Sequence, residues 1–397
     1  MNQFSARMDT IKPSPVVVIS NEVRKMRAAG EKVFSFSIGV PGFLPPEHVY
    51  KAAENAAKRD SDGGAYLSSR GVPELVEAFL HRLEEDGFSG YTEKEVCAQM
   101  GGKGALFNLL LALAGPGKEV IYPAPYWTSY DDLVTLSGAT PKPIYCSADQ
   151  NYKLTGAQLE AAITPNTQVF MFNNPSNPTG MVYTEEEVKE IAAVLKKYPH
   201  VWVISDDIYD KLIYDGQKFH HLLDAEPTLK DRLAIVQSVS KSYGMPCWRV
   251  GMVAAPEALI NQLLTLVGQT LFHLPAVPQM AAAAAFGGDH SFLNVVKNDF
   301  VQNRNTTMDA LNSLNNIQCC QPSGAFYAFP NISACLGKND INNDVEFCQK
   351  LLQEQQVACI PGSAFGDPNA IRISYATDAD TLRQGLQRLC DFVEKLS

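Results

Sequence analysis

The chain has 397 residues, of which 46% are apolar and 19% are charged, as in a globular protein long enough for two or three domains. Its net charge of −10 argues against a nucleic-acid-binding surface, which is usually basic. The nine cysteines are scattered without a C-x-x-C motif. This argues against a zinc site or a disulfide framework and favours a reducing cytoplasm.

The sequence predicts neither a secretory signal nor a membrane span. The N-terminal residues lack the basic region and apolar core of a secretory signal. The most apolar stretch, Leu263–Phe286, is interrupted by Gln269, His273 and Pro275. A membrane-spanning helix needs about 20 consecutive apolar residues, so we expect a cytoplasmic protein with no membrane partner.

Helical and strand-like segments alternate from about residue 47 to residue 290. The pattern predicts helices at Gly104–Ala114 and Thr184–Lys197, the second beginning with a Thr-x-x-Glu capping box. Short apolar runs predict buried strands at Glu119–Tyr122, Val169–Phe172, Val201–Ser205 and Ala234–Gln237. This alternation indicates an α/β fold with a mostly parallel sheet covered on both faces, and ligands bind such sheets at the carboxyl ends of the strands.

The C-terminal third has a different pattern. A long helical stretch near Ser291–Asn315 precedes short strands at Phe326–Phe329 and Ile371–Tyr375 and a final helix. We therefore predict a large domain at residues 47–290. A smaller α+β domain is predicted to combine residues 1–46 with residues 291–397.

A lysine follows the predicted strand at Ala234–Gln237. In Ser238-Val239-Ser240-Lys241, the two serines lie three and one residues before the lysine, and Arg249 lies eight residues after it. Lys241 on its own is equally compatible with a solvated loop. The functional interpretation is an amine nucleophile beside a phosphate held by Ser238, Ser240 and Arg249.

A carboxylate ends the predicted strand at Val201–Ser205. Asp206 is costly to bury unless it is paired, so it is either a helix cap or the partner of a cofactor ring nitrogen. Tyr209, three residues later, is then placed to reach a phenolic oxygen of the same ring. Asn177, in Asn-Pro-Ser-Asn-Pro-Thr-Gly, is either ordinary turn chemistry or an amide that binds cofactor and substrate.

Three further positions complete the candidate site. Gly102 and Lys103 lead into the predicted helix at Gly104–Ala114, whose free N–H groups suit a phosphate, although the stretch is not a Walker motif. Trp127 follows a strand and is either a core residue or a ring that stacks on a flat cofactor. Arg372 lies in an apolar strand and needs an anionic partner, for which a substrate carboxylate is a candidate.

In this order, the motifs resemble the class I (aspartate aminotransferase-type) aminotransferases of fold type I, which depend on pyridoxal 5′-phosphate (PLP). The resemblance runs from Lys12-Pro13-Ser14 to Arg372 and is closest to the bacterial-type aspartate aminotransferases. It implies a large domain with a mostly parallel, seven-stranded sheet, a smaller α+β domain and a homodimer with shared sites.

The resemblance also implies a role for each residue. Lys241 matches the Schiff-base lysine, Asp206 the partner of the pyridine nitrogen and Tyr209 the phenolic-oxygen ligand. The remaining matches are Trp127 for ring stacking, Gly102, Lys103, Ser238, Ser240 and Arg249 for the phosphate, Tyr66 for the neighbouring subunit's phosphate, and Arg372, Asn177 and the Gly39 backbone for the substrate α-carboxylate. Lys103, assisted by Ser14, matches the group that pairs with the distal carboxylate of an acidic substrate. No metal is implied.

The activity implied is ping-pong transfer of the amino group of L-aspartate to 2-oxoglutarate, giving oxaloacetate and L-glutamate. Val40 stands where the subgroup usually has an acidic residue, and Cys247 stands where it usually has glycine. These departures keep aromatic, alanine and broad-range aminotransferases open as alternatives. A PLP-dependent lyase and a non-catalytic PLP-binding sensor are alternatives of other classes.

Overall fold

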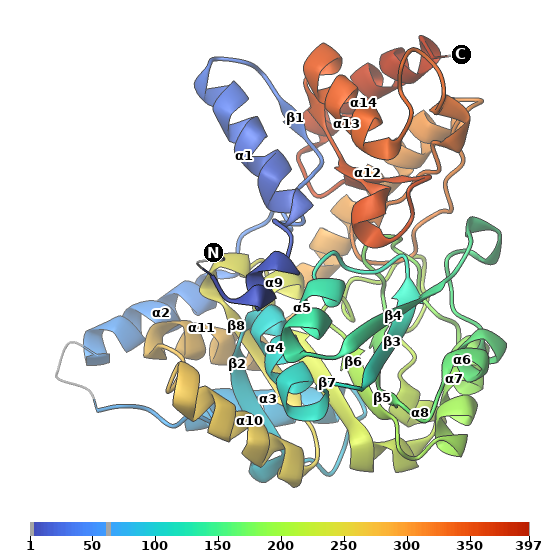
Figure 1. Ribbon diagram of the computed structural model, residues 1–397. Helices are drawn as coiled ribbons and strands as arrows, with labels where there is room; N and C mark the ends of the chain where they lie inside the picture. Colours follow the sequence, from blue (N-terminus) through green and yellow to red (C-terminus); the bar gives the residue numbers. More distant parts are fainter. Residues whose placement is uncertain (1–3, 61–64, 397) are drawn as a thin grey trace.

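A computed structural model describes residues 4–60 and 65–396 of the chain, and these residues form a central sheet of seven strands (Figure 1). The strand order is β2-β8-β7-β6-β5-β3-β4. Strand β8 runs antiparallel to both of its neighbours, whereas the other neighbouring pairs are parallel. This confirms the predicted α/β class and the mostly parallel sheet. The strands are β2 (Val96–Met100), β3 (Glu119–Ala124), β4 (Thr140–Tyr145), β5 (Thr167–Asn173), β6 (Trp202–Asp206), β7 (Leu233–Ser238) and β8 (Val250–Ala254).

Helices cover both faces of this sheet. They are α2 (Glu47–Asp60), α3 (Pro73–Glu85), α4 (Gly101–Leu113), α5 (Tyr130–Ser137), α6 (Gly156–Ala162), α7 (Glu185–Lys197), α8 (Leu222–Ala225), α9 (Val239–Ser242), α10 (Glu257–Thr270) and α11 (Ala276–Gly287). Neighbouring residues of β5 belong to different apolar clusters: Phe170 packs with α3, α7 and α11, and Val169 packs with α4, α5 and α10. Because both faces are buried, the central strands are apolar throughout rather than alternating.

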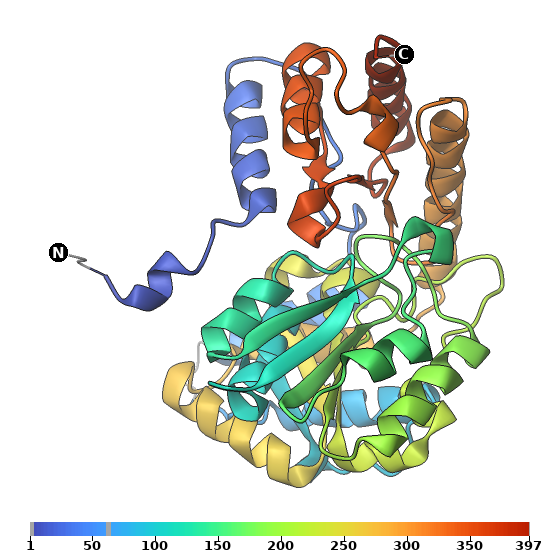
Figure 2. The same ribbon diagram turned by 45° about the vertical axis from the view of Figure 1, so that its right-hand side comes forward.

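A second group of elements packs around its own apolar cluster above the sheet (Figure 2). Its helices are α1 (Pro15–Ala28), α12 (Phe292–Asn312), α13 (Asp344–Gln355) and α14 (Ala379–Glu394). Its strands are β1 (Phe34–Ser35), β9 (Tyr327–Ala328), β10 (Val357–Ala358), β11 (Ile360–Pro361) and β12 (Ile371–Ser374). Short 3₁₀ helices occupy Ala6–Asp9, Glu93–Glu95, Ala148–Gln150, Pro227–Arg232, Pro246–Trp248, Ser333–Cys335 and Gly362–Phe365.

The N-terminal residues join this second group. Strand β1 pairs in parallel with β10, through Phe34 with Val357. On α1, Val23 packs with Leu352 of α13 and Ala358 of β10. The exact division at residues 46 and 290 stays a prediction, but these contacts support combining the two ends of the chain.

Element ends differ from the predicted ones by a few residues. Shifts of three residues occur at the end of α12, which is Asn312 rather than Asn315, and at the start of α4, which is Gly101 rather than Gly104. Two adjacent glycines favour a loop, but Gly101 takes a φ of +66° and the helix follows directly. The shift places Gly102 and Lys103 in the first helical turn. Helix α7 begins as predicted, with Thr184 and Glu187 forming the capping box.

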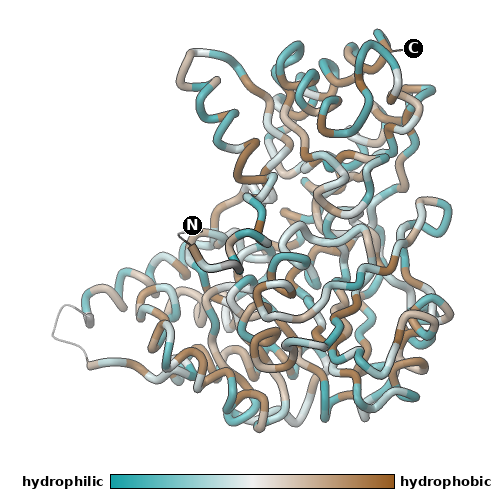
Figure 3. Tube along the Cα trace, viewed as in Figure 1, coloured by the Kyte–Doolittle hydropathy of each residue, from teal (hydrophilic) through white to brown (hydrophobic). Residues whose placement is uncertain are grey.

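Polar and apolar residues are interspersed along the outer helices (Figure 3). Within residues 4–60 and 65–396, no helix is both long and apolar enough to cross a membrane.

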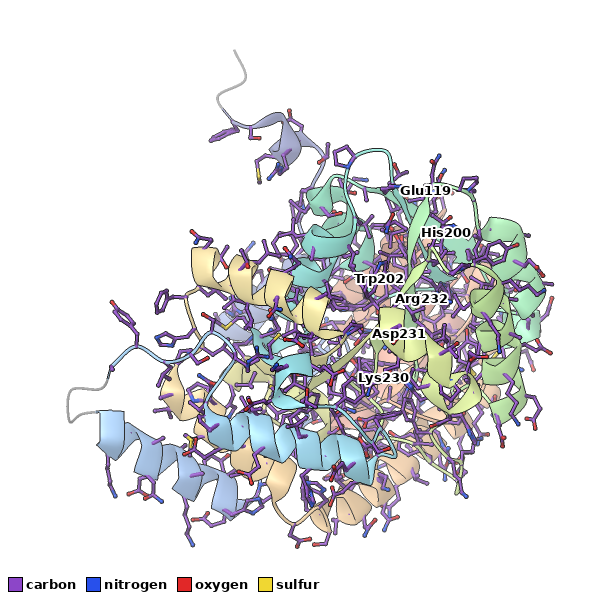
Figure 4. The ribbon with its side chains drawn as sticks, turned by 90° about the horizontal axis from the view of Figure 1, so that it is seen from below. Glu119, His200, Trp202, Lys230, Asp231 and Arg232 are labelled. Atoms are coloured by element: carbon purple, nitrogen blue, oxygen red, sulfur yellow. The ribbon has the colours of Figure 1, made fainter. Side chains whose placement is uncertain are left out.

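The amino ends of the parallel strands carry structural polar contacts. Seen from below, Glu119, Trp202 and Arg232 lie at this edge of the sheet (Figure 4). The Arg232 guanidinium donates to the backbone carbonyl oxygens of Leu195 and Val201, and Glu119 accepts from the Thr164 hydroxyl at 2.6 Å. These side chains therefore connect backbone segments. The predicted site residues lie at the opposite edge.

A buried ion network ties α3 to the segments that follow β6 and β7. Arg82, 2% exposed, donates to Asp210 and to Asp86, each at 2.7 Å, and also contacts the Tyr243 hydroxyl. Asp210 follows Tyr209 in sequence, and Tyr243 lies two residues after Lys241. The network thus fixes the backbone on which two predicted site residues stand.

Replacing Arg82 by methionine is expected to lower the free energy of unfolding by about 3–5 kcal/mol, because it removes the buried cation from two buried carboxylates and leaves Lys211 as their remaining cationic partner. Denaturant unfolding followed by circular dichroism measures the change. Arg383→Met is the control, since Arg383 pairs with Asp380 on the exposed surface of α14 and should contribute less than about 1 kcal/mol. Equal stability of the two variants would contradict a structural role for the network.

Candidate active site

A cavity of about 240 Å³ lies at the carboxyl ends of the central strands, between the sheet and the second group of elements. Ten of the fourteen predicted site residues line it: Ser14, Gly39, Gly102, Lys103, Trp127, Asn177, Asp206, Tyr209, Lys241 and Arg372. Of the other four, Ser238, Ser240 and Arg249 lie in the segments next to it. Tyr66 lies outside the cavity of its own chain.

Lys241 stands on α9, the short helix that follows β7, and its Nζ atom donates to the Gly39 carbonyl oxygen at 2.5 Å. Burial, followed by the positive charges of Arg372 and Arg249, lowers the pKa of the Lys241 amine to about 7. The charge of Asp206 opposes this shift. An amine with this pKa is partly neutral near pH 7, as a nucleophile or general base requires.

Asp206 ends β6 and is 3% exposed. Its Oδ2 atom accepts a hydrogen bond of 2.6 Å from the Tyr130 hydroxyl, whereas Oδ1 has no partner among the described residues. Burial raises the pKa of the Asp206 carboxyl to about 7. Because Asp206 lines the cavity and its Oδ1 atom has no partner, this oxygen is suited to accept a hydrogen bond from a protonated nitrogen of a ligand.

Arg372, on β12, is 2% exposed. One guanidinium nitrogen donates to Asn177 Oδ1 at 3.1 Å, and the other donates to the Ser37 carbonyl oxygen at 2.7 Å. The guanidinium also lies 4.5 Å from the centre of the Tyr327 ring. Nε has no partner within residues 4–60 and 65–396, so the arginine is oriented but retains donor capacity for an anion.

A group of donors gathers on the far side of Lys241. The Ser238 hydroxyl donates to Ser240 Oγ at 2.8 Å, and Arg249 reaches back towards the start of α4. Arg249 lies so close to Gly101 that a Cβ atom at that position would be 2.4 Å from Arg249 Nη2. Two hydroxyls, a guanidinium and the N-terminal turn of α4 form a set that suits a phosphate.

Trp127 and Lys103 line the cavity next to each other. Lys103 Nζ lies 4.9 Å from the centre of the Trp127 ring. Burial, followed by the charge of Arg249, lowers the pKa of the Lys103 amine, and Asp132 opposes this shift. Neither Val40 nor Cys247, the two departures from the subgroup pattern, lines the cavity, and both are exposed.

Two tyrosines of the site were not predicted. Tyr130 bonds to Asp206, and the Tyr327 hydroxyl lies 2.9 Å from that of Tyr209. Tyr130 begins a helix three residues after Trp127, and Tyr327 follows Phe326 in a short strand. In both cases the sequence shows a tyrosine without a recognisable motif, and only the fold shows where its hydroxyl points.

The described residues contain no group of three or more His, Cys, Asp or Glu side chains that could hold a metal ion. The Ser238–Ser240 hydroxyls, the Asp206 oxygen without a partner and the Arg372 guanidinium suit an organic ligand that is flat and anionic and carries a protonatable ring nitrogen.

Residues 31–389 match the family model described as aminotransferase class I and II. The chain belongs to this family. An aspartate/prephenate aminotransferase of Cereibacter sphaeroides is 39% identical over 99% of the chain and 99% of that protein. An aspartate aminotransferase of Rhizobium meliloti is 36% identical over 100% of the chain and 97% of that protein.

Solved structures agree with this assignment. The crystal structure of the aspartate aminotransferase from Rhizobium meliloti covers all of the chain with a TM-score of 0.95 and 36% identity. The Thermus thermophilus aspartate aminotransferase with maleate covers 98% of the chain with a TM-score of 0.91 and 29% identity. These comparisons confirm the class I aminotransferase family and the fold that the motifs indicated.

Proposed function

We propose that this aminotransferase uses PLP to transfer the amino group of L-aspartate to 2-oxoglutarate, giving oxaloacetate and L-glutamate by a ping-pong mechanism. The observation that carries the proposal is that the Lys241 amine, the unpartnered Asp206 oxygen and the oriented Arg372 guanidinium line one cavity. The names of the relatives support an acidic substrate, as does the dicarboxylate maleate that accompanies the Thermus thermophilus enzyme in its structure.

The residues present fit PLP. Asp206 would pair with the ring nitrogen, Trp127 would stack on the ring, and Tyr209 would reach the phenolic oxygen. Gly102, Lys103, Ser238, Ser240 and Arg249 would hold the phosphate. When bound, PLP supplies an electron sink for the pair of electrons released at the substrate Cα atom.

The chain's own residues supply binding and proton transfer. Arg372, Asn177 and the Gly39 backbone would hold the substrate α-carboxylate and fix the Cα–H bond relative to Lys241. The Lys241 amine, with a pKa of about 7, can accept the Cα proton and return it at another atom. Asp206 stabilises positive charge at the ring nitrogen, on which the electron sink depends.

We also propose a cytoplasmic homodimer. Tyr66 is 85% exposed, outside its own cavity, and its ring packs edge-on to Phe272 at 5.1 Å. A tyrosine placed in this way is available to the phosphate site of a second copy. The free state of all nine cysteines is compatible with a reducing compartment.

The proposed function is tested by an absorbance spectrum of the purified protein with PLP, before and after L-aspartate is added. We expect a visible imine band that decreases with aspartate and returns with 2-oxoglutarate. A band that ignores aspartate but responds to alanine or tyrosine would overturn the substrate assignment, and release of ammonia would indicate a lyase. A band without turnover would indicate a sensor, and the absence of any band would overturn the use of PLP.

Prephenate is a second candidate amino acceptor, because the relative at 39% identity is named aspartate/prephenate aminotransferase. Like 2-oxoglutarate, it has a 2-oxo acid group for Arg372 and a second carboxylate for the opposite wall. Incubation with L-aspartate and prephenate, with oxaloacetate formation as the readout, tests this candidate directly.

Lys103 is proposed to pair with the distal carboxylate of the substrate. Lys103→Met should then lower kcat/KM for aspartate by about 10- to 100-fold, the effect expected when a charged hydrogen bond is lost. Activity with alanine, which has no distal carboxylate, serves as the control and should change by less than about threefold. Equal losses with the two substrates would contradict this role and indicate that Lys103 acts on the cofactor phosphate instead.

A further inference from the structure

One hydroxyl of a buried tyrosine cluster points at Asp206. Tyr122, Tyr126 and Tyr130 pack together, with ring centres 5.1 and 5.6 Å apart. The hydroxyls of Tyr122 and Tyr126 both donate to Asp131. The Tyr130 hydroxyl instead donates to Asp206 Oδ2 at 2.6 Å. Within this cluster, Tyr130 therefore makes the contact with the candidate site.

We propose that Tyr130 is a positioning residue for the cofactor: it occupies Oδ2 of Asp206 and so presents Oδ1 to the cavity as the oxygen that binds the ring nitrogen. The inference rests on the proposed function, because the ring nitrogen is that of PLP. The inference goes beyond the proposed function because it explains how the Asp206 carboxylate, whose two oxygens are chemically equivalent, is held in one orientation. It also explains how this carboxylate remains able to accept a hydrogen bond from the ring nitrogen.

The surroundings of Tyr130 fix it in place. The residue is 2% exposed and begins α5, where its backbone N–H donates to the Trp127 carbonyl oxygen at 2.9 Å. Its ring lies edge-on to the Trp127 ring at 5.8 Å. The same residue therefore contacts both Trp127, which would stack on the cofactor ring, and Asp206, which would pair with the ring nitrogen.

Asp206 is sensitive to the loss of a single donor. Burial raises its pKa to about 7 and the charge of Asp207 adds to this shift, whereas the Tyr130 hydrogen bond, then the Ile208 backbone N–H and then the charge of Lys241 lower the pKa. Asp207 is itself fully buried and accepts from Ser205 at 2.6 Å, with His221 Nε2 at 3.2 Å. Tyr209 is the other titratable group close by. Removing the Tyr130 hydroxyl shifts this balance towards the protonated acid, which has no negative charge to stabilise a protonated nitrogen.

Tyr130 can act only as a donor at ordinary pH. Burial, followed by the charge of Asp206, raises the pKa of its hydroxyl well above the usual value. It therefore keeps its proton and does not compete with Lys241 as a base. Because Tyr130 keeps its proton, its role is to position Asp206 and not to transfer a proton to or from the substrate.

The test compares Tyr130→Phe with Tyr122→Phe in the holoenzyme. Each change removes one buried hydroxyl and retains the ring, but only the first affects Asp206. We expect Tyr130→Phe to weaken PLP binding by about 10- to 100-fold, measured by fluorescence titration of the cofactor-free protein. We also expect it to raise the pH midpoint of the bound cofactor's absorbance change. When the ring nitrogen carries less positive charge, the ring withdraws electron density less strongly from the imine nitrogen at Lys241. The imine nitrogen then has a higher pKa and keeps its proton to higher pH.

A double-mutant cycle with Asp206→Asn tests whether Tyr130 acts through Asp206. In the Asp206→Asn background, Tyr130→Phe should weaken PLP binding by less than about threefold. Unchanged affinity and midpoint in Tyr130→Phe, or equal changes in Tyr130→Phe and Tyr122→Phe, would overturn the inference while the proposed function stands. A wild-type protein that does not bind PLP would overturn both.

Discussion

Replacing Lys241 by alanine is expected to abolish amino transfer, with a decrease in turnover on the order of 10⁴. The change removes both the amine that would hold the cofactor and the base that would move the Cα proton. Among the described residues, Lys103 is the other lysine that lines the cavity, and it is less deeply buried than Lys241. The measurement is turnover with aspartate and 2-oxoglutarate, together with the absorbance of the protein after PLP is added. PLP should then bind without the imine band.

The control is Lys94→Ala, because Lys94 lies on the surface and pairs weakly with Glu257 at 3.9 Å. It should retain turnover within about twofold. A Lys241→Ala protein that keeps more than a tenth of wild-type turnover would exclude Lys241 as the essential amine.

The wild-type protein offers a second readout of the same residue. Since the pKa of the Lys241 amine is about 7 before the cofactor binds, its reactive neutral form should increase about tenfold from pH 6 to pH 8. The rate at which the imine band forms should rise over this range and level off above it. A rate that keeps rising to pH 10 would show that the pKa is not lowered.

Arg372→Leu is expected to produce the second largest loss. Truncating a buried partner of a carboxylate costs about 2–5 kcal/mol, which corresponds to a decrease of about 30- to 5000-fold in kcat/KM. Because both substrates carry an α-carboxylate, the decrease should be similar for aspartate and for 2-oxoglutarate. PLP affinity should change little, since Arg372 lies on the substrate side of Lys241.

Arg372→Lys is the informative comparison. Lysine keeps the charge but cannot contact Asn177, Ser37 and a carboxylate in one plane, so its activity should fall between those of the wild type and Arg372→Leu. In Arg372→Leu, loss of the positive charge should also raise the pKa of Lys241, which Arg372 lowers. Losses confined to one of the two substrates would contradict the shared carboxylate site.

The sequence was sufficient for the sheet and for the main polar residues because each depends on local pattern. Apolar runs alternating with helices predict parallel strands, and chemistry-bearing residues at their carboxyl ends converge at one edge. The antiparallel direction of β8 was not predictable, because the apolar residues Val250–Ala254 indicate a buried strand but not its direction in the sheet. The start of α4 was misplaced because Gly101 and Gly102 are poor helix residues, and the close approach of Arg249 that requires glycine at Gly101 is a tertiary contact.

Tyr130 and Tyr327 show the limit of such reasoning. Each hydroxyl meets its partner across a large sequence separation, 76 residues for Tyr130 with Asp206 and 118 for Tyr327 with Tyr209. A tyrosine outside any recognisable motif is equally compatible with simple packing, and the direction of its hydroxyl depends on tertiary structure. The pattern identified the carboxylate but not the group that orients it.

The main-chain contacts of Ser37 and Gly39 have a consequence for how this enzyme can vary. The Ser37 carbonyl oxygen holds Arg372, and two residues later the Gly39 carbonyl oxygen holds Lys241. Both contacts use atoms that every residue type possesses. The exposed Val40 beside this segment can therefore change at little cost to the two contacts, whereas a Cβ atom at Gly39 would lie 2.2 Å from the Tyr327 hydroxyl. An insertion or deletion of a single residue between Phe36 and Val40 would displace the two carbonyl oxygens relative to each other, so the length of this segment is constrained by both contacts.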